Sequence, residues 1–366
     1  MKNVAVIFGG KSIEHEISVI TGTLTLNSLD TFKFNPIPIF VDKEGLWWTG
    51  EILKDLDKYK NLNKKKLTRV TLVLGEHNLY SLKNNKRKLL CPIACAINCM
   101  HGERGEDGSL SGLLNMCSIP IASPNVFCSS LCISKNQTKI MLKGLGIKTL
   151  PYVTASSTND CPVIEQRLEY PLIVKPDTGG SSIGINTAKN KKELSSALLV
   201  ALRYSKSAIV EPLLAEFEEI NCACYRVGEK VVVSECEKPF ARGEILSFED
   251  KYQSGKRQFP AMIDKKISDK IKGITQEIYT KLEFDGIIRV DYIIYQGKVY
   301  VNEINTVPGS LAYYLFVKTL KEYTELLTTL INDSLVRGAK DSTLIKNFSS
   351  GILSIGGCKA SKRLKK

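Results

Sequence analysis

Two apolar, β-rich segments in the last third of the chain carry polar residues that a buried strand does not tolerate without a partner. IIRVDYIIY and KVYVNEIN are separated by the turn-forming pair Gln296–Gly297, which predicts a β-hairpin. Arg289 and Asp291 lie two residues apart on the first strand, so their side chains share one side of it. Glu303 and Asn305 have the same spacing on the second strand. The pattern therefore predicts four polar side chains on a hairpin that is otherwise apolar.

The length of the hairpin loop decides whether the two polar pairs face the same side of the hairpin. They do so only if the loop has an odd number of residues, because side chains alternate along each strand. A three-residue loop over residues 295–297, with Gly297 in the left-handed conformation, is a standard solution and is the loop that we predict.

The acidic side chains of this hairpin need a cation, because carboxylates are almost never fully buried unless they are paired or bound to metal. Asp291, Glu303 and Asn305 offer two carboxylates and one amide. Such an all-oxygen ligand set suits Mg²⁺ rather than zinc or iron. The alternative is a solvated strand face, which alternating polar and apolar residues commonly form. We favour a magnesium–phosphate site.

The length and composition are those of a soluble globular protein with several domains. The 366 residues are enough for two or three domains, and 43% hydrophobic and 24% charged residues are ordinary values. No apolar run approaches the roughly 20 residues that span a bilayer, so no membrane insertion is expected. The first segment, MKNVAVIFGG, has too short an apolar part for a secretory signal. We expect a cytoplasmic protein.

Neither the cysteines nor the positive charge indicates a function. The eleven cysteines are scattered and form no CxxC pair, so we expect no disulfides and no structural metal. Much of the net charge of +13 lies in discrete runs, such as residues 64–66, 86–88 and 359–366. No zinc finger, helix-turn-helix signature or interleaved aromatic residues accompany these runs, so a lysine-rich solvated surface is favoured and nucleic acid is not an expected partner.

Strand and helix signals alternate in the first third of the chain. NVAVIF, NPIPIFV and Leu89–Ile97 have the composition of strands, and a helix is predicted over Glu14–Leu29. This order predicts a parallel sheet with helices on its faces. The Lys- and Asn-rich segment 55–66 is expected to be a surface excursion. We assign residues 1–128 to an N-terminal α/β domain.

The order of elements changes near Cys128. Helical patterns at 135–146 and 190–204 accompany strand patterns at 170–176 and 207–214, which we assign to a central subdomain, residues 129–215. Residues 216–348 form a predicted C-terminal domain with strands, the hairpin and helices at 268–282 and 313–336. The irregular polar segment 238–262 is a predicted mobile lid. Residues 349–366 have the composition of a flexible basic tail.

A loop rich in glycine and serine follows a buried strand that ends in a lysine. Lys175 and Pro176 end the strand, and the loop contains residues 179–182, Gly-Gly-Ser-Ser. Glycines let the backbone approach a phosphate, and successive N–H groups can form an anion-binding nest. The loop matches neither the Walker A motif nor the G-x-G-x-x-G fingerprint. Taken alone, such a loop is more often a hairpin turn than a phosphate cradle, but Lys175 favours the phosphate.

Six motifs follow one another along the chain in a specific order. They are FGGKSIEHEIS at 8–18, HGERGEDG at 101–108, VKPDTGGSSIG at 174–184, VEP with a later glutamate at 210–218, DKYQSG at 250–255, and RVDYIIY with VNEINTVPG at 289–309. The ordered set resembles the D-alanine–D-alanine ligases of the ATP-grasp superfamily and covers nearly the whole chain. The resemblance implies an α/β fold (α+β overall) of ATP-grasp architecture, with an N-terminal parallel α/β domain that holds the first D-alanine.

The resemblance also implies a nucleotide site. Lysines would hold the ATP phosphates, with Lys251 of the predicted lid closing over the γ-phosphate. Glu211 would lie near the adenine amino group, and Glu218 would bind the ribose hydroxyls. The full implied nucleotide set is Lys135, Lys175, Ser182, Glu211, Leu213, Glu218 and Lys251.

The polar hairpin acquires defined roles from the same resemblance. Asp291, Glu303 and Asn305 would bind two Mg²⁺ ions, for which Mn²⁺ is expected to substitute. Arg289 and the Gly309 N–H would form the site for the oxyanion that develops during the reaction.

The first D-alanine would lie against the N-terminal domain. The resemblance implies that Glu14 receives its ammonium group and is linked through Ser181 to Tyr252, in a hydrogen-bonded triad that locks the lid. His101 would lie beside its carboxylate. Without the motif, we would interpret His101 as an ordinary loop histidine. Glu14 would be an acidic residue in the first turn of a helix, where it complements the helix dipole.

One position departs from the family pattern. Tyr314 stands where the family typically has a serine that binds the second substrate's carboxylate. We expect Ser310, Tyr313 or Tyr314 to supply that hydroxyl. Related ligases of vancomycin resistance join D-alanine to D-lactate or D-serine. Tyr252 argues against the lactate type, which carries a histidine at that position, and D-serine stays an alternative acceptor.

The implied activity is the ATP-dependent joining of two D-alanines for peptidoglycan synthesis, through a D-alanyl phosphate, with release of ADP and phosphate. A homodimer is also implied by the resemblance. A non-catalytic nucleotide-binding or basic scaffold protein is the alternative from another class, and the intact Lys175, Arg289 and metal ligands disfavour it.

Overall fold

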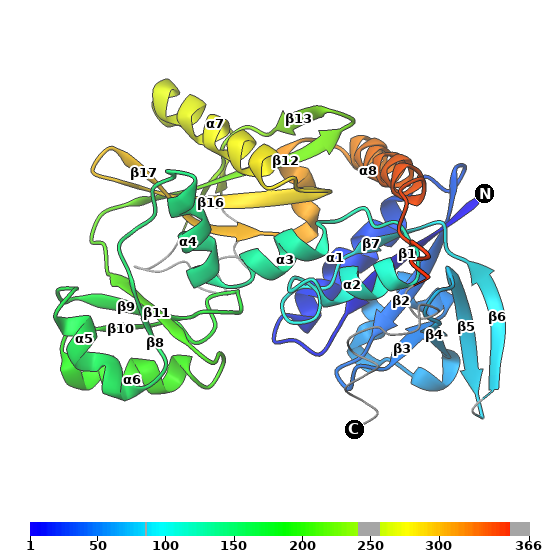
Figure 1. The fold of residues 1–366 in the computed structure, drawn as a ribbon, viewed down its shortest axis with the longest axis horizontal. Coiled ribbons are helices and arrows are strands. Elements are labelled where there is room, and N and C mark those ends of the chain that lie inside the picture. The colour runs from blue at the N-terminus through cyan, green and yellow to red at the C-terminus, as the bar shows by residue number, and fades with distance from the viewer. Residues whose placement is uncertain (85, 241–256, 352–366) are drawn as a thin grey trace.

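The protein has three main sheets, arranged around a shared centre (Figure 1). The computed structural model describes residues 1–84, 86–240 and 257–351. Each of the three main sheets carries its own helices. Within the described ranges, no helix is long and apolar enough to cross a membrane. The ten described cysteines are free thiols.

The N-terminal sheet has seven strands in the order β6-β5-β4-β3-β2-β1-β7. They span Lys2–Gly9 (β1), Phe34–Val41 (β2), Trp47–Thr49 (β3), Thr68–Leu72 (β4), Asn78–Lys83 (β5), Lys86–Pro92 (β6) and Cys95–Asn98 (β7). Only β1 pairs in parallel, with β2 and β7, while every pair from β2 to β6 is antiparallel. The prediction of a parallel sheet therefore holds for the three strands at the β7 end.

The predicted strand Leu89–Ile97 is wrong, because two strands at opposite edges of the sheet share that segment. Leu89 and Leu90 lie on the exposed edge strand β6, whereas Cys95–Asn98 is buried beside β1. The apolar composition runs through both strands and hides the break between them at residues 93–94. The segment 51–66 is a series of three 3₁₀ helices, Glu51–Lys54, Leu56–Asn61 and Lys64–Lys66, and the last two bury no residue, as a surface excursion requires.

The N-terminal region contains three helices of ordinary length. They are α1 (His15–Ser28), α2 (Ser109–Met116) and α3 (Val126–Cys132). The predicted helix at 14–29 is confirmed to within one residue at each end. Asn125 caps α3, because its side chain accepts a hydrogen bond from the Cys128 N–H.

The central sheet is antiparallel, in the order β10-β9-β11-β8. Its strands are Val153–Ala155 (β8), Leu172–Pro176 (β9), Asn186–Ala188 (β10) and Ala208–Pro212 (β11), and its helices are α4 (Lys135–Gly144), η4 (Thr158–Asp160), α5 (Cys161–Glu165) and α6 (Lys191–Ala201). Ser134 caps α4 through the Gln137 N–H, and Asn190 caps α6 through the Glu193 N–H. The Ser134 cap places Lys135 at the first turn of α4.

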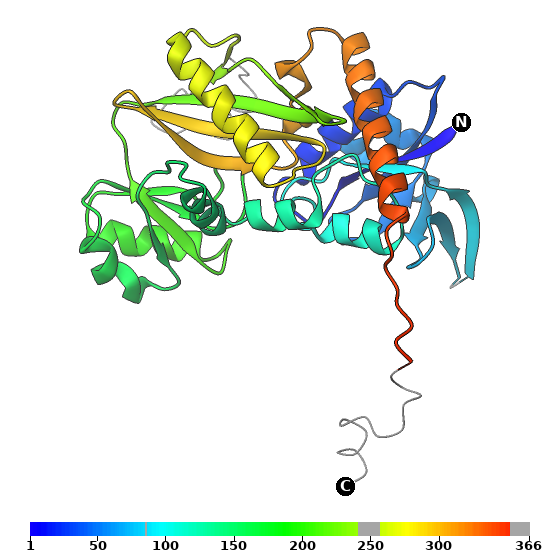
Figure 2. The same cartoon turned by 45° about the horizontal axis from the view of Figure 1, so that its top comes forward.

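The third main sheet contains the polar hairpin, in the order β13-β12-β16-β17. Its strands are Glu218–Val227 (β12), Lys230–Val233 (β13), Ile287–Tyr295 (β16) and Lys298–Asn305 (β17). Helix α7 (Lys265–Lys281) packs on this sheet (Figure 2). The short strands β14 (Lys238–Pro239) and β15 (Arg257–Gln258) pair with each other, and the predicted lid lies largely between them, outside the described residues. A 3₁₀ segment, η6 (Gly309–Leu315), and α8 (Leu320–Ser342) follow the hairpin.

The hairpin loop differs from the predicted one. Tyr295 pairs with Lys298, so the loop contains two residues, Gln296 and Gly297, both with positive φ. A β-bulge corrects the parity instead, because Asp291 pairs with Glu303 while Tyr292 pairs with Val301. The predicted common face of the polar pairs is therefore correct, and its predicted cause is wrong.

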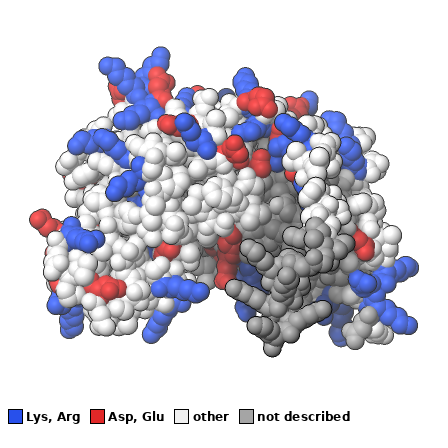
Figure 3. Space-filling model, viewed as in Figure 1, with Lys and Arg blue, Asp and Glu red and all other residues white. Residues whose placement is uncertain are grey.

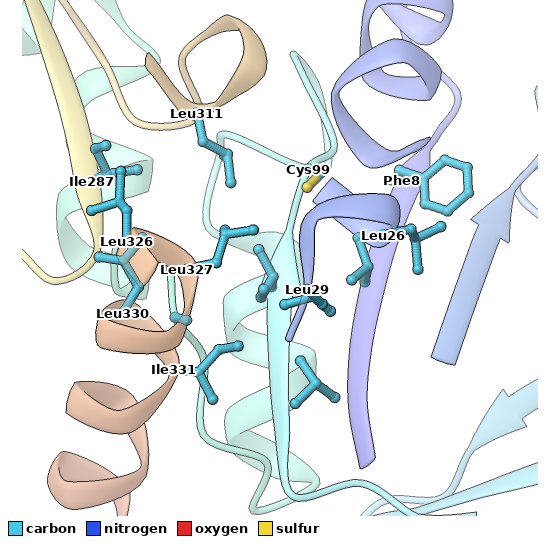
Figure 4. Packing of buried hydrophobic residues seen from close by; sticks show 14 of the residues in the cluster. Phe8, Leu26, Leu29, Cys99, Ile287, Leu311, Leu326, Leu327, Leu330 and Ile331 are labelled. Carbon is cyan, nitrogen blue, oxygen red and sulfur yellow. The ribbon is translucent and has the colours of Figure 1, made fainter. Parts of the chain in front are cut away.

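One hydrophobic cluster joins the last helix to the N-terminal region (Figure 4). Leu326, Leu327 and Ile331 of α8 belong to the same buried cluster as Phe8 of β1 and Leu26 of α1. The hydroxyl groups of Thr25 and Tyr323 lie 3.1 Å apart and connect α1 to α8. The two ends of the described chain therefore share one core, which fixes α1 against η6 and the hairpin.

Positive side chains are spread over one face of the molecule (Figure 3). Figure 3 shows Lys and Arg distributed around the outline of one face, with Asp and Glu among them. This distribution on the visible face is consistent with the lysine-rich solvated surface favoured above.

Candidate active site

A cavity of about 350 Å³ lies where the three main sheets meet. Most of the predicted site residues line it, although they come from segments far apart in the sequence. The predicted residues in its lining are Glu14, His101, Lys135, Lys175, Ser181, Ser182, Glu211, Leu213, Arg289, Asp291, Glu303, Asn305, Gly309, Ser310 and Tyr314. Lys251 and Tyr252 lie outside the described residues, and their roles stay predictions.

Glu14 and Ser181 meet at one end of the cavity. The Ser181 hydroxyl donates a hydrogen bond to Glu14 Oε1, which links the start of α1 to the Gly-rich loop. A Cβ on Gly180 would lie 3.0 Å from the same oxygen, and a Cβ on Gly102 would lie 3.0 Å from Oε2. Close approach to this carboxylate therefore explains Gly180, whereas Gly102 also has a φ of 71° and a Cβ there would clash with Ser12 Oγ. Two of the three members of the predicted triad are in place.

Glu106 is a site residue that the sequence reasoning missed. Its Oε2 accepts from the Gly102 N–H at 2.8 Å, and its Oε1 accepts from the Val307 N–H at 3.1 Å. This side chain joins the loop after β7 to the turn after β17. Burial and the neighbouring Glu14 carboxylate raise the pKa of Glu106 to about 8. Its position in the HGERGEDG motif was the available signal.

His101 is held by a threonine of α1. Its Nε2 lies 2.9 Å from the Thr21 hydroxyl oxygen, which also accepts from the Ser310 N–H at 3.1 Å. Burial and the nearby Arg289 guanidinium lower the pKa of His101 to about 4, so the imidazole is neutral at neutral pH. Thr21, another residue missed from sequence, thus connects the first-substrate side of the cavity to η6.

The hairpin presents its polar face to the cavity. Arg289 donates from Nε to Asp291 Oδ1 at 2.7 Å and from Nη2 to Oδ2 at 2.9 Å, a bidentate pair. Asn305 Nδ2 lies 3.0 Å from Asp291 Oδ2. Glu303 is the cross-strand partner of Asp291. Two carboxylates and an amide therefore converge on one cavity wall, which fits the oxygen ligand set that Mg²⁺ requires.

Lysines gather opposite this wall. Asp177 accepts from the Asn136 N–H at 2.8 Å and so fixes the start of α4, and Lys135 Nζ donates to the Gly179 carbonyl at 2.8 Å. Lys135 Nζ also lies 3.9 Å from Glu303.

The Gly-rich loop has an unusual backbone. Ser181 and Ser182 have φ values of 54° and 60°, a strained conformation that is typical of functional loops. Cations, loop and carboxylates together can hold a phosphate chain and its metal.

Glu211 lies between two lysines. Its Oε2 is 2.6 Å from Lys175 Nζ, and its Oε1 is 2.5 Å from Nζ of Lys139, which the sequence reasoning missed. At these distances both lysines form ion pairs with the buried Glu211 carboxylate. The available signal for Lys139 was its place four residues after Lys135 on the predicted helix, which puts both lysines on one face.

The cavity also has an apolar part that suits a flat base. Its members are Leu150, Ile173, Leu213, Leu214, Phe217, Ile293 and Ile304. Glu219 lines the cavity as well, whereas Glu218 does not. The Glu218 carboxylate lies 3.3 Å from Lys238 Nζ instead. The structure thus separates Glu218 from the other predicted nucleotide residues, and its role at the ribose stays a prediction.

The three candidate hydroxyl residues of the acceptor site lie in different surroundings. Tyr313 is absent from the cavity lining and stacks on Tyr323 in the core, with ring centroids 4.4 Å apart. Ser310 and Tyr314 line the cavity. The Arg257 guanidinium, which the sequence reasoning missed, lies 4.1 Å from the centroid of the Tyr314 ring.

Comparison with known families explains this set of residues. A family model described as D-ala D-ala ligase N-terminus matches residues 3–124, and one described as D-ala D-ala ligase C-terminus matches residues 141–335. The chain belongs to the D-alanine–D-alanine ligase family. This membership agrees with the family resemblance of the six motifs and with the ATP-grasp architecture.

Individual relatives of this ligase family match over nearly the whole chain. The D-alanine–D-alanine ligase of Thermosipho melanesiensis is 34% identical over 365 residues, covering 97% of this chain and 99% of the relative. A crystal structure of the Helicobacter pylori ligase has a TM-score of 0.77 at 30% identity, covering 91% and 98% of the two chains. The VanG D-Ala:D-Ser ligase of Enterococcus faecalis has the same TM-score at 26% identity, covering 91% and 99%.

Proposed function

We propose that this protein joins two D-alanines to D-alanyl-D-alanine, with ATP converted to ADP and phosphate, for peptidoglycan synthesis. The observation that supports this most strongly is one cavity in which a carboxylate for an ammonium group, a neutral histidine and a guanidinium lie opposite phosphate-binding lysines. These are Glu14, His101 and Arg289, with Lys135 and Lys175. Membership of the ligase family supplies the identity of the substrates.

The first step activates the donor. A carboxylate is a poor acyl donor, so one oxygen of the first D-alanine attacks the γ-phosphorus of ATP and forms D-alanyl phosphate as ADP departs. Glu14 holds the ammonium group of this D-alanine, and the neutral His101 lies beside its carboxylate. Lys135 and Lys175 neutralise the phosphate oxygens.

The second step forms the amide. The free amine of the second amino acid attacks the acyl carbon, and the negative charge moves to the carbonyl oxygen. Arg289 and the Gly309 N–H stabilise this oxyanion until the bond between the acyl carbon and the phosphate oxygen breaks. The attacking nitrogen gives up one proton, which the departing phosphate can accept. Water would hydrolyse the acyl phosphate, so the site must close during the reaction.

Asp291, Glu303 and Asn305 are the residues that would hold divalent cations. Two Mg²⁺ ions, with Mn²⁺ as a substitute, would supply charge neutralisation to the phosphates when bound. Arg289 pairs with Asp291, so the guanidinium and the cations would contact the same carboxylate. We include in the proposal a cytoplasmic location and a homodimer, both on the strength of the family resemblance.

D-Serine is the second candidate acceptor. The acceptor end differs from the family pattern at Tyr314, and the D-Ala:D-Ser ligase named above shares the fold. Arg257 lies over the Tyr314 ring and 3.4 Å from the Glu237 carboxylate, so the side chains around Tyr314 are charged as well as aromatic.

The test is ADP release with D-alanine alone and with D-alanine plus D-serine or D-lactate, each with mass analysis of the product. We expect ADP release with D-alanine alone and D-alanyl-D-alanine as the product. A mixed dipeptide as the main product with D-serine would establish the second candidate. Absence of ADP release in all three mixtures would refute the ligase function.

A further inference from the structure

Lys139 is a buried cation at the back of the nucleotide end of the cavity. Its side chain is 2% exposed, and that of its partner Glu211 is 1% exposed. The Lys139 Nζ lies 5.4 Å from the centroid of the Tyr152 ring as well. Lys139 does not line the cavity, whereas Glu211 and Lys175 do. The three charges therefore form a row that runs from the interior to the cavity wall.

The charges in this row do not balance. Burial alone would raise the pKa of Glu211, but Lys175 and Lys139 lower it to about 2, so the carboxylate is ionised. Two lysines against one carboxylate leave a net charge of +1 within this row, and the Glu303 and Glu219 carboxylates of the cavity lining also act on Lys175. Lys175 is the lysine of this row that lines the cavity, and its Nζ also donates to Asn302 Oδ1 at 3.3 Å.

Stability is a poor explanation for Lys139. A buried ion pair commonly contributes no more than an apolar residue of similar volume, because desolvation offsets the attraction. An apolar side chain at this position of α4 would pack without that desolvation cost. The presence of Lys139 as a second buried lysine beside Glu211 therefore needs an explanation other than stability.

We propose that Lys139 is a positioning residue for nucleotide binding. It neutralises Glu211, so that Lys175 can pair with the phosphates of ATP. Without Lys139, Lys175 would be the sole counter-ion of a buried carboxylate in this row. A phosphate would then compete with Glu211 for Lys175, and leaving Glu211 unpaired would be costly. This inference rests on the proposed function, because it takes ATP as the ligand.

The test compares ligands with and without phosphates on the full-length protein. ADP, ATP and adenosine are titrated in the same Mg²⁺-containing buffer with wild type, Lys139→Met and Lys139→Gln. We expect both variants to bind ADP and ATP roughly tenfold or more weakly, which corresponds to about 1.4 kcal/mol. The Kd for adenosine should stay within about twofold of the wild-type value, because Glu211 is still present to contact the base. Lys139→Arg should restore most of the ADP affinity.

Lys143→Met is the matched control, because Lys143 lies on the same helix and is exposed. Unchanged ADP binding by the Lys139 variants, or an equal loss for adenosine, would overturn the inference. So would failure of both neutral variants to fold, since the charge would then serve the fold. Wild-type protein that binds neither ATP nor ADP would refute the proposed function itself.

Discussion

The bidentate pair between Arg289 and Asp291 shows how one residue can serve two ligands. The guanidinium neutralises a carboxylate that the divalent cations would also use. Cation binding at Asp291 would weaken that pair and leave Arg289 available to the oxyanion. If the proposed roles hold, the assembly of the phosphate site and the release of Arg289 for the second step would depend on the same carboxylate.

Asp291→Asn and Glu303→Gln should each reduce the rate of ADP release by roughly 10²-fold or more, because each removes negative charge from the cation site while keeping the side-chain shape. The far-UV circular dichroism spectrum should stay that of wild type. The measurement is steady-state ADP release at saturating D-alanine. Near-normal rates in either variant would contradict the cation assignment.

Tyr314→Phe should raise KM for the second D-alanine more than KM for the first, with little change in kcat. Tyr314 lines the cavity at the end that we assign to the acceptor, and losing uniform binding affects KM alone. Tyr313→Phe is the matched control, because that ring packs in the core. Ser310→Ala tests the other hydroxyl of the cavity lining. If neither Tyr314→Phe nor Ser310→Ala changes the second KM, the acceptor carboxylate is bound elsewhere.

At the scale of elements, the loop after β7 is held to the turn after β17 by Glu106. A carboxyl group with a raised pKa binds more protons in the folded protein than in the unfolded one. Its stabilising effect is therefore complete below its unfolded value and is lost as the pH rises through its folded value of about 8. The relevant window extends from about pH 4.5 to about pH 8.

Glu106→Gln should therefore gain stability relative to wild type as the pH rises through this window, because glutamine cannot ionise. The measurement is the difference in Tm between variant and wild type at several pH values from 5 to 8.5. A constant difference over this pH range would show that Glu106 does not titrate as described.

The hairpin shows which part of the site can be predicted from sequence. The spacing of Arg289 with Asp291, and of Glu303 with Asn305, predicts that each pair lies on one side of its own strand, because strand periodicity is strict. The common face of the two pairs depended on a three-residue loop, which the structure replaces with a two-residue loop and a bulge. The bulge escaped prediction, although Asn302 and Glu303 are consecutive polar residues on a strand that is otherwise apolar. Both line the cavity, as the two residues of a bulge can. Two adjacent polar residues of this kind are the signal for a bulge.

Other residues could be predicted only by their tertiary partners. Thr21 and Lys139 are ordinary helix residues until His101 and Glu211 come within reach. The order of strands in the N-terminal sheet could not be predicted from the sequence either. Composition indicates strands, but it does not reveal that β6 and β7 lie at opposite edges.

At the scale of the whole molecule, α8 holds the C-terminal elements against the N-terminal sheet. Leu327→Ala should lower the free energy of unfolding by about 2–5 kcal/mol, because Leu327 is fully buried in the cluster that joins α8 to α1. The measurement is urea denaturation followed by circular dichroism. Leu320→Ala is the control on the same helix, since that side chain is 59% exposed. Equal stability of the two variants would contradict the shared core.

The transfer of oxygen from D-alanine to phosphate tests the central claim most directly. D-Alanine labelled with ¹⁸O in its carboxylate is incubated with the protein, ATP and Mg²⁺, and the inorganic phosphate is analysed by mass spectrometry. An acyl phosphate predicts one ¹⁸O in each phosphate released and ADP as the nucleotide product. Unlabelled phosphate, or AMP in place of ADP, would contradict it.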